Sequence, residues 1–299
     1  MSLSQFLAIV ELRTKIVSLS TFSLALIYAV STGREIPLGL ALLTLAAALA
    51  VDMGTTAFNS YFDYLRRVDH RRYNRESDKV IVHRGVDPGA AFFSAAGCFA
   101  AAVVLGGIIA LLRGWEIAAV GAACMAVGFL YTGGPRPISS TPLGELFAGG
   151  FLGSVFFLIT FYILTGGLTH EALLASLPSA LMIASILSVN NACDIEGDRA
   201  AGRKTLAILV GPKAAAALVP GWGGLTLATT AFLVILAVLP YSVAAGLVIL
   251  LPPAVVEYRR MFTRGFSHET KGPNMGSISR IFKLFSLGYG AGLLAGLWI

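Results

Sequence analysis

The chain alternates between long stretches free of Asp, Glu, Lys and Arg and shorter stretches rich in these residues. The uncharged stretches cover residues 16–33, 36–51, 88–112, 117–135, 146–170, 172–193, 214–256 and 284–299. Most are close to the roughly 20 residues that cross a bilayer as a helix. The stretch 214–256 is long enough for two helices, with a turn expected at Pro240-Tyr241-Ser242. The pattern predicts an all-α integral membrane protein with nine transmembrane helices in a single domain over residues 1–299.

Composition and charge agree with a membrane protein and indicate its orientation. The chain is 56% hydrophobic and only 13% charged, whereas soluble domains carry about 25% charged residues. Of its 22 Lys and Arg residues, only Arg34 and Arg113 fall in the loops that nine spans place opposite the N-terminus. The positive-inside rule therefore predicts that segments 1–15, 64–87, 132–144, 195–213 and 257–283 face the cytoplasm. The first residues lack a basic region followed by a small-residue cleavage site, so we expect the first span to insert uncleaved.

The net charge of +6 raises the question of a nucleic acid partner. The basic residues flank the predicted spans and do not form a long basic face interleaved with aromatic residues. We therefore expect no nucleic acid partner, and we expect these residues to face membrane lipid or an anionic substrate.

The second predicted helix carries polar residues into the membrane. Residues 36–51 are short for a span unless the helix continues through Asp52 to about Asp63. Ionisable groups inside a membrane are costly, so their presence indicates function.

Carboxylates and amides gather on one face at the ends of the second and sixth helices. The pairs four residues apart are Asn59 and Asp63, Asn190 and Asp194, and Asp194 and Asp198. At about 100° per residue, such pairs lie within about 40° of each other on a helix. Converging like charges repel, so a hard cation explains the two clusters better than solvated helix ends do. Mg²⁺ commonly binds carboxylates together with substrate phosphates, which predicts a diphosphate between the clusters.

Asp69 sets a geometric condition on the first cluster. It follows Asp63 by six residues, about 240° around a continuous helix, so the helix must end or unwind after Tyr64 if both bind one ligand.

Basic residues near the clusters are candidates for neutralising phosphate oxygens, although topology alone accounts for many of them. The candidates are Arg66, Lys79, Arg203 and Lys204, of which the last three are preferred.

Three ordered motifs resemble those of one enzyme family. They are Asn59-Ser-Tyr-Phe-Asp63-Tyr-Leu-Arg-Arg-Val-Asp69, Tyr131-Thr-Gly-Gly-Pro135 with Leu143-Gly144-Glu145, and the segment from Asn190-Asn191 to Gly202-Arg203-Lys204-Thr205-Leu206. Over nearly its whole length the chain resembles the UbiA superfamily of membrane prenyltransferases, and most closely the 1,4-dihydroxy-2-naphthoate prenyltransferases. It departs from them at Ser60, where many members have Asp, and at Thr56 and Cys193, where the naphthoate branch often has Asn and Arg.

The resemblance implies a ring of nine helices around a lipid-accessible central cavity capped by cytoplasmic loops, in the bacterial cytoplasmic membrane. It implies Mg²⁺-dependent transfer of a prenyl chain from a polyprenyl diphosphate to a small aromatic acceptor. The acceptor expected is 1,4-dihydroxy-2-naphthoate of menaquinone biosynthesis. The implied metal ligands are Asn59, Asp63, Asp69, Asp194 and Asp198, and these four carboxylates with Tyr131, above the prenyl diphosphate, form the implied catalytic set. The implied substrate-binding residues are Asn59, Arg66, Lys79, Asn190, Arg203 and Lys204.

Alternatives stay open at this point. The acceptor can instead be 4-hydroxybenzoate, homogentisate or a tetrapyrrole such as chlorophyllide or haem. A transporter also places Asp and Asn in membrane helices, but its sites usually lie near the midplane on broken helices, whereas these clusters lie at helix ends beside basic loops. Asp52 and Glu145 are further candidates for orienting or deprotonating the acceptor, with a helix-end charge or an interhelical hydrogen bond as equal alternatives.

Overall fold

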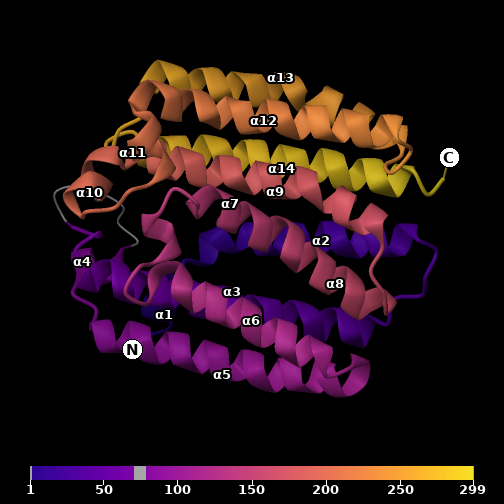
Figure 1. The fold of residues 1–299 in the computed structure, drawn as a ribbon, viewed down its shortest axis with the longest axis horizontal. Helices are drawn as coiled ribbons and strands as arrows, with labels where there is room; N and C mark the ends of the chain where they lie inside the picture. Colours follow the sequence, from indigo (N-terminus) through magenta and orange to yellow (C-terminus); the bar gives the residue numbers. More distant parts are fainter. Residues whose placement is uncertain (1, 71–78, 299) are drawn as a thin grey trace.

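The computed structural model describes residues 2–70 and 79–298. These residues form helices joined by short connections, and no β-strand occurs among them. Figure 1 shows long helices that run side by side, with the short helices α1, α4, α10 and α11 near one end of the bundle. The expected all-α class is confirmed.

The long helices account for most of the chain. They are α2 (Ile16–Ser31), α3 (Leu38–Leu65), α5 (Pro88–Arg113), α6 (Glu116–Thr132), α9 (His170–Cys193), α12 (Pro212–Ile235), α13 (Tyr241–Arg264) and α14 (Lys271–Ala295). A further continuous helix consists of α7 (Gly144–Gly149), a π-helical segment (Gly150–Val155) and α8 (Phe156–Thr165). The short helices are α1 (Leu3–Ile9), α4 (Val80–Arg84), α10 (Ile195–Ala200) and α11 (Leu206–Val210), and 3-10 turns cover Leu12–Lys15 and Ile138–Ser140.

Seven helices in the described residues are long and apolar enough to cross a membrane, which makes this a multi-pass membrane protein. The expected count of nine is not confirmed. Helix α6 has only 17 residues, and α14, although long, carries Lys271, Arg280 and Lys283 and is not one of the seven. The number of spans therefore stays a prediction.

Packing brings the end of the chain back to its beginning. Helix α3 packs against α2, α5 and α6, and α9 packs against α7, α12 and α14. Helix α13 packs between α12 and α14, and α14 also packs against α2. Helices α12 and α13 lie together on one side of the bundle, away from α3, α5 and α6 (Figure 1).

Glycines allow two of these helix pairs to touch through their backbones. A Cβ atom added to Gly153 would lie 2.3 Å from Cα of Ala180 on α9. One added to Gly246 of α13 would lie 2.4 Å from the carbonyl oxygen of Gly288 on α14. Small residues at such contacts are typical of membrane helices, whose association depends on close packing.

Two of the predicted helix limits are confirmed, and one is wrong. Helix α3 continues through Asp52 to Leu65, and the turn at Pro240 separates α12 from α13. The segment 257–283, however, is not a loop, because α13 reaches Arg264 and α14 begins at Lys271. Charged residues are accommodated in these helices by pairing, as Arg280 of α14 lies 2.9 Å from Glu257 of α13.

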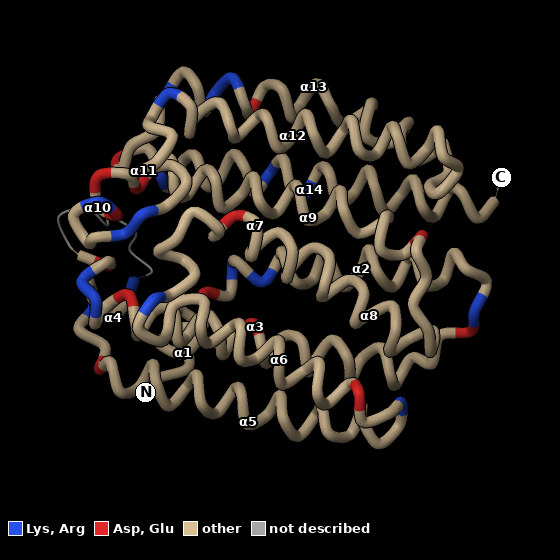
Figure 2. Tube along the Cα trace, in the orientation of Figure 1, with Lys and Arg blue, Asp and Glu red and all other residues tan. Residues whose placement is uncertain are grey.

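Charge is concentrated at one end of the bundle. Figure 2 shows Lys, Arg, Asp and Glu gathered around α4, α10 and α11, with fewer charged residues along the long helices. This agrees with the expectation that one end of the helices carries most of the basic residues.

Candidate active site

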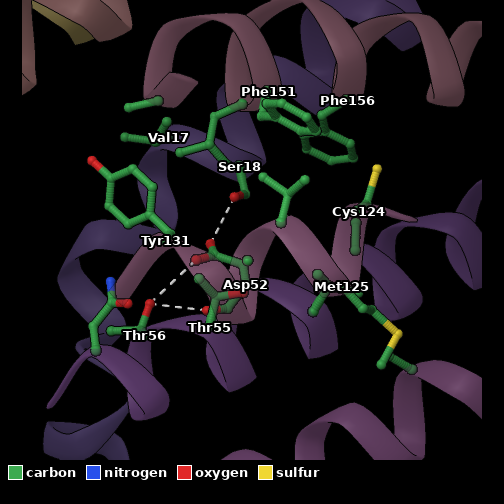
Figure 3. A pocket seen from close by; sticks show the side chains of 18 of the residues that line it. Val17, Ser18, Asp52, Thr55, Thr56, Cys124, Met125, Tyr131, Phe151 and Phe156 are labelled. Carbon is green, nitrogen blue, oxygen red and sulfur yellow. Dashed lines mark hydrogen bonds between the residues drawn. The ribbon is translucent and has the colours of Figure 1, made fainter. Parts of the chain in front are cut away.

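A cavity of about 870 Å³ opens within the bundle and joins a charged end to an apolar body. Its charged end is lined by Asp63, Lys79 and Arg203, together with the amides of Asn59 and Asn190. Its apolar body is lined by α3, α5, α6, α9 and the continuous helix from α7 to α8. The larger apolar side chains there are Trp115, Met125, Phe147, Phe151, Phe156, Ile159 and Ile163. In Figure 3 the rings of Phe151 and Phe156 lie across the cavity from Thr55 and Thr56. No described residue of α12 or α13 lines it.

The end of α3 folds Asp69 back toward Asp63. Arg67, just beyond the helix, has a positive φ of 58°, which reverses the chain. The backbone N–H groups of Val68 and Asp69 then both donate to the carbonyl oxygen of Asp63, at 2.9 and 3.2 Å. The condition set by the six-residue spacing is therefore met, since the helix ends at Leu65.

Arg203 joins the two acidic motifs. Its guanidinium lies 2.9 Å from Oδ1 of Asp198 and 3.3 Å from Oδ1 of Asp63, and it donates to Oγ of Ser139 at 3.1 Å. Burial alone would lower the pKa of Arg203, but the two carboxylates outweigh it and raise that pKa. Burial raises the pKa of Asp198, and Arg203 acts in the opposite direction. The motifs after the second and sixth predicted helices thus meet at the charged end of the cavity.

A model of the UbiA prenyltransferase family matches residues 18–274. The chain belongs to this family. Its curated relatives include the 1,4-dihydroxy-2-naphthoate octaprenyltransferases of Bacillus subtilis (strain 168), 41% identical over 187 residues, and of Mycobacterium tuberculosis (strain ATCC 25618 / H37Rv), 33% identical over 171 residues. The matches cover 62% and 57% of this chain and 59% and 58% of the relatives, so the chain spans less than two thirds of their length.

Solved structures support the fold of this UbiA family member. A UbiA homolog from Archaeoglobus fulgidus bound to GPP and Mg²⁺ aligns with a TM-score of 0.65 over 99% of this chain and 100% of that one, at 16% identity. A UbiA homolog from Aeropyrum pernix K1 aligns with a TM-score of 0.63 over 93% and 96% of the two chains, at 20% identity. At these identities the likeness concerns the fold alone.

The remaining predicted carboxylates and amides of the UbiA motifs each have a partner. Lys79 lies 3.7 Å from Oδ2 of Asp69 and 2.8 Å from Oε1 of Glu11. Oδ2 of Asp194 lies 2.7 Å from Nζ of Lys271. On the cavity wall, Oδ1 of Asn59 accepts a hydrogen bond from Thr132 at 2.6 Å.

Tyr131 and Asn190 line the cavity, and their contact with a substrate stays a prediction. The amide of Asn190 lies 3.5 Å from that of Asn191, whose Nδ2 donates to Oε1 of Glu145 at 2.9 Å. Glu145 is buried and lies behind this wall, not in it. It therefore takes part in an interhelical hydrogen bond, one of the two alternatives expected for it.

Arg66 and Lys204 do not line the cavity. The guanidinium of Arg66 donates to the carbonyl oxygens of Thr132 and Gly134 and lies 5.4 Å from the ring centre of Phe62. The side chain of Lys204 is exposed, and its backbone N–H donates to Ser140. Contact of these two residues with a substrate stays a prediction.

The donor set fits a hard divalent cation, although the described residues contain no group of three or more His, Cys, Asp or Glu placed to hold a metal. The carboxylates of the two motifs are paired with Arg203, Lys79 and Lys271 instead. Oδ2 of Asp198, however, is buried and has no hydrogen-bond partner among the described residues. Burying a carboxylate oxygen without a hydrogen-bond donor or a cation beside it costs free energy. Mg²⁺ prefers oxygen ligands, so this oxygen suits a Mg²⁺ ion.

Sequence reasoning missed the cations that accompany two of the acidic residues. Lys15 is only 3% exposed and contacts Oδ1 of Asp52 at 2.6 Å, and Lys271 contacts Asp194. The sequence pattern predicts that Lys15 and Lys271 lie in segments flanking the membrane helices. The signal that could have found Lys15 is Asp52 itself, since an acidic residue inside a membrane helix requires a partner.

Proposed function

We propose that this protein transfers a prenyl chain from a Mg²⁺-bound prenyl diphosphate to 1,4-dihydroxy-2-naphthoate. The proposal is supported by membership of the UbiA prenyltransferase family and by two relatives named 1,4-dihydroxy-2-naphthoate octaprenyltransferases. The observation that carries it is the cavity, in which Asp63, Lys79 and Arg203 lie at one end of a long apolar space. A diphosphate head and a hydrocarbon chain need these two environments side by side.

The charged end would bind the diphosphate. Arg203 and Lys79 line the cavity with cationic groups, and cations aimed at a leaving group stabilise the charge that develops on it. A bound Mg²⁺ would be held by carboxylates of the two motifs, with Asp63 and Asp198 nearest to Arg203, and would neutralise diphosphate oxygens. Asn59, Asp69 and Asp194 are the further proposed ligands.

The apolar body would hold the prenyl chain and keep water from the reacting carbon. The allylic carbon–oxygen bond breaks with both electrons leaving on the diphosphate, and a ring carbon of the acceptor forms the new bond. The acceptor's carboxyl group leaves as carbon dioxide, which gives a prenylated naphthoquinol. Because water quenches an allylic cation, lining by Phe151, Phe156 and Ile159 favours transfer to the ring. The ring of Tyr131 offers a π-face to the cation.

We also propose that the charged end faces the cytoplasm of a bacterium. Nearly all Lys and Arg residues fall in the segments predicted for that side, and cytoplasmic loops carry such an excess. Prenyl chains longer than the cavity would then extend between helices into membrane lipid.

In the deciding experiment the purified full chain is incubated with Mg²⁺ and labelled geranyl diphosphate. Separate reactions contain 1,4-dihydroxy-2-naphthoate, 4-hydroxybenzoate or homogentisate as the acceptor. The expected product is a geranylated naphthoquinol that has lost carbon dioxide, and chelation of Mg²⁺ should abolish it. A geranylated product from another acceptor alone would refute the naphthoate assignment. Absence of diphosphate release with every acceptor would refute prenyl transfer.

A further inference from the structure

A buried ion pair forms part of the cavity wall below the charged end. Asp52 lines the cavity, whereas its partner Lys15 lies behind it. Asp52 and Asp63 are eleven residues apart on α3, which at 1.5 Å per residue separates them by about 16 Å along the helix. The carboxylate of Asp52 therefore lies apart from the proposed diphosphate site.

The ammonium group of Lys15 has no donor left for a ligand. It contacts Oδ1 of Asp52 at 2.6 Å, Oγ1 of Thr56 at 2.8 Å and the carbonyl oxygen of Asp52 at 3.4 Å. A lysine ammonium has three donors, so these three contacts account for all of them. With a side chain only 3% exposed, Lys15 neutralises Asp52 but offers no positive charge to the cavity.

The carboxylate of Asp52, in contrast, retains capacity to accept. Its Oδ2 receives one hydrogen bond from the described residues, from the hydroxyl of Ser18 at 2.6 Å (Figure 3). Each carboxylate oxygen has about two acceptor positions, and the side chain is 17% exposed, toward the cavity that it lines. The wall thus presents a fixed hydrogen-bond acceptor within a space that suits an aromatic ring.

We propose that Asp52 is the acceptor-binding residue of this cavity, where its carboxylate accepts a hydrogen bond from a ring hydroxyl of the aromatic acceptor. The inference rests on the proposed function and adds to it the group that is recognised. Lys15 and Ser18 act as positioning residues, because they hold the carboxylate in one orientation.

The arrangement also sets the direction in which the acceptor enters. A carboxylate on the acceptor would meet Asp52 with like charge and find no donor on Lys15, so it must point elsewhere. Lys79 and Arg203 carry the positive charge at the charged end of the cavity. The hydroxyl that binds Asp52 therefore lies on the part of the ring directed away from the diphosphate.

The test compares binding of 1,4-dihydroxy-2-naphthoate with that of two analogues lacking one hydroxyl each, 1-hydroxy-2-naphthoate and 4-hydroxy-2-naphthoate. Dissociation constants are measured on the full chain in phosphatidylcholine nanodiscs with Mg²⁺ and geranyl thiolodiphosphate, a slowly ionising donor analogue. One analogue should bind the wild-type chain about 10- to 100-fold more weakly than the parent, because it loses a hydrogen bond to a charged group. In Asp52→Ala the same analogue should bind within about threefold of the parent.

A second variant guards against misfolding of the first. Asp52→Ala leaves a buried lysine without its carboxylate, so the double variant Lys15→Met with Asp52→Ala removes both charges, and it should show the same loss of hydroxyl discrimination. Glu35→Ala, which changes an exposed acid in the connection between α2 and α3, is the matched control and should keep the wild-type penalty.

Two outcomes would overturn the assignment. One is a wild-type chain that binds both analogues as tightly as the parent, and the other is a pair of Asp52 variants that retain the wild-type penalty. Because these measurements require no turnover, their failure can be told apart from failure of the proposed function, which fails if the wild-type chain does not prenylate the parent compound with geranyl diphosphate.

Discussion

Arg203 offers the sharpest test of how the charged end works, because one guanidinium contacts carboxylates from both acidic motifs. Arg203→Met removes the contacts with Asp63 and Asp198 together with one of the two cations that line the charged end. Loss of a preorganised group that stabilises developing charge typically costs about 2.7–4 kcal/mol, or 10²- to 10³-fold in kcat. We expect that loss at saturating geranyl diphosphate and acceptor.

The same substitution should change how Mg²⁺ affects stability. Removing one member of a buried ion pair typically destabilises by about 3–5 kcal/mol, since the remaining charge is left uncompensated. Here Asp63 and Asp198 would remain together, and a divalent cation would relieve their repulsion. The rise in Tm on adding Mg²⁺ should therefore be larger for Arg203→Met than for the wild-type chain.

Two matched variants separate charge from geometry. Arg203→Lys keeps the charge but cannot contact two carboxylates with a planar fork, so its kcat should fall between those of Arg203→Met and the wild type. Arg199→Met changes an exposed arginine of the same segment and should leave kcat and the Mg²⁺ response unchanged. A kcat for Arg203→Met within threefold of wild type would refute the assigned role, and so would an identical Mg²⁺ response.

Three further predictions concern the metal, the helix packing and the apolar body. Asp63→Asn should abolish Mg²⁺-dependent turnover while the protein still inserts into membranes, and full activity would contradict the metal assignment. Gly153→Ala should lower Tm, because its new methyl group meets the backbone of Ala180 and overpacking typically costs about 1–3 kcal/mol, whereas Gly150→Ala in the same segment meets no atom within 4 Å and should not. Equal Tm values for the two glycine variants would count against the packing described. Gly121→Leu fills part of the cavity wall and should reduce kcat/KM for farnesyl diphosphate more than for geranyl diphosphate, and equal losses would exclude this wall from chain-length selection.

Features that depend on nearby residues could be predicted from the sequence. The length of α3 followed from the shortness of its uncharged stretch, and the turn before α13 followed from Pro240 within a stretch too long for one span. The end of α3 near Tyr64 followed from the six-residue spacing between Asp63 and Asp69. Each of these inferences needs only helical geometry and a few consecutive residues.

Features that depend on distant partners could not be predicted in this way. Lys15 and Asp52 are 37 residues apart, and Lys271 and Asp194 are 77 residues apart. Hydropathy treats each of these charges as a cost, so it places both lysines outside the membrane helices. In the folded chain each is neutralised by a carboxylate, and α14 can therefore begin at Lys271. Arg66 is predicted to contact a substrate because it follows Asp63 closely in the sequence. Sequence position does not show where a side chain points, and in the structure the Arg66 side chain turns toward Thr132 and Gly134.

The reversal at Arg67 has a mechanical consequence for the charged end. Two backbone hydrogen bonds to the carbonyl oxygen of Asp63 fasten Val68 and Asp69 to the last turn of α3. These bonds hold the backbone of Asp69 to the end of α3, so a tilt of α3 would carry the backbones of both Asp63 and Asp69 with it. Asp198 belongs to a separate short helix, α10, and among the described residues the side chain of Arg203 contacts both Asp198 and Asp63. The separation of Asp63 from Asp198 is thus set in part by one guanidinium, which contacts both carboxylates.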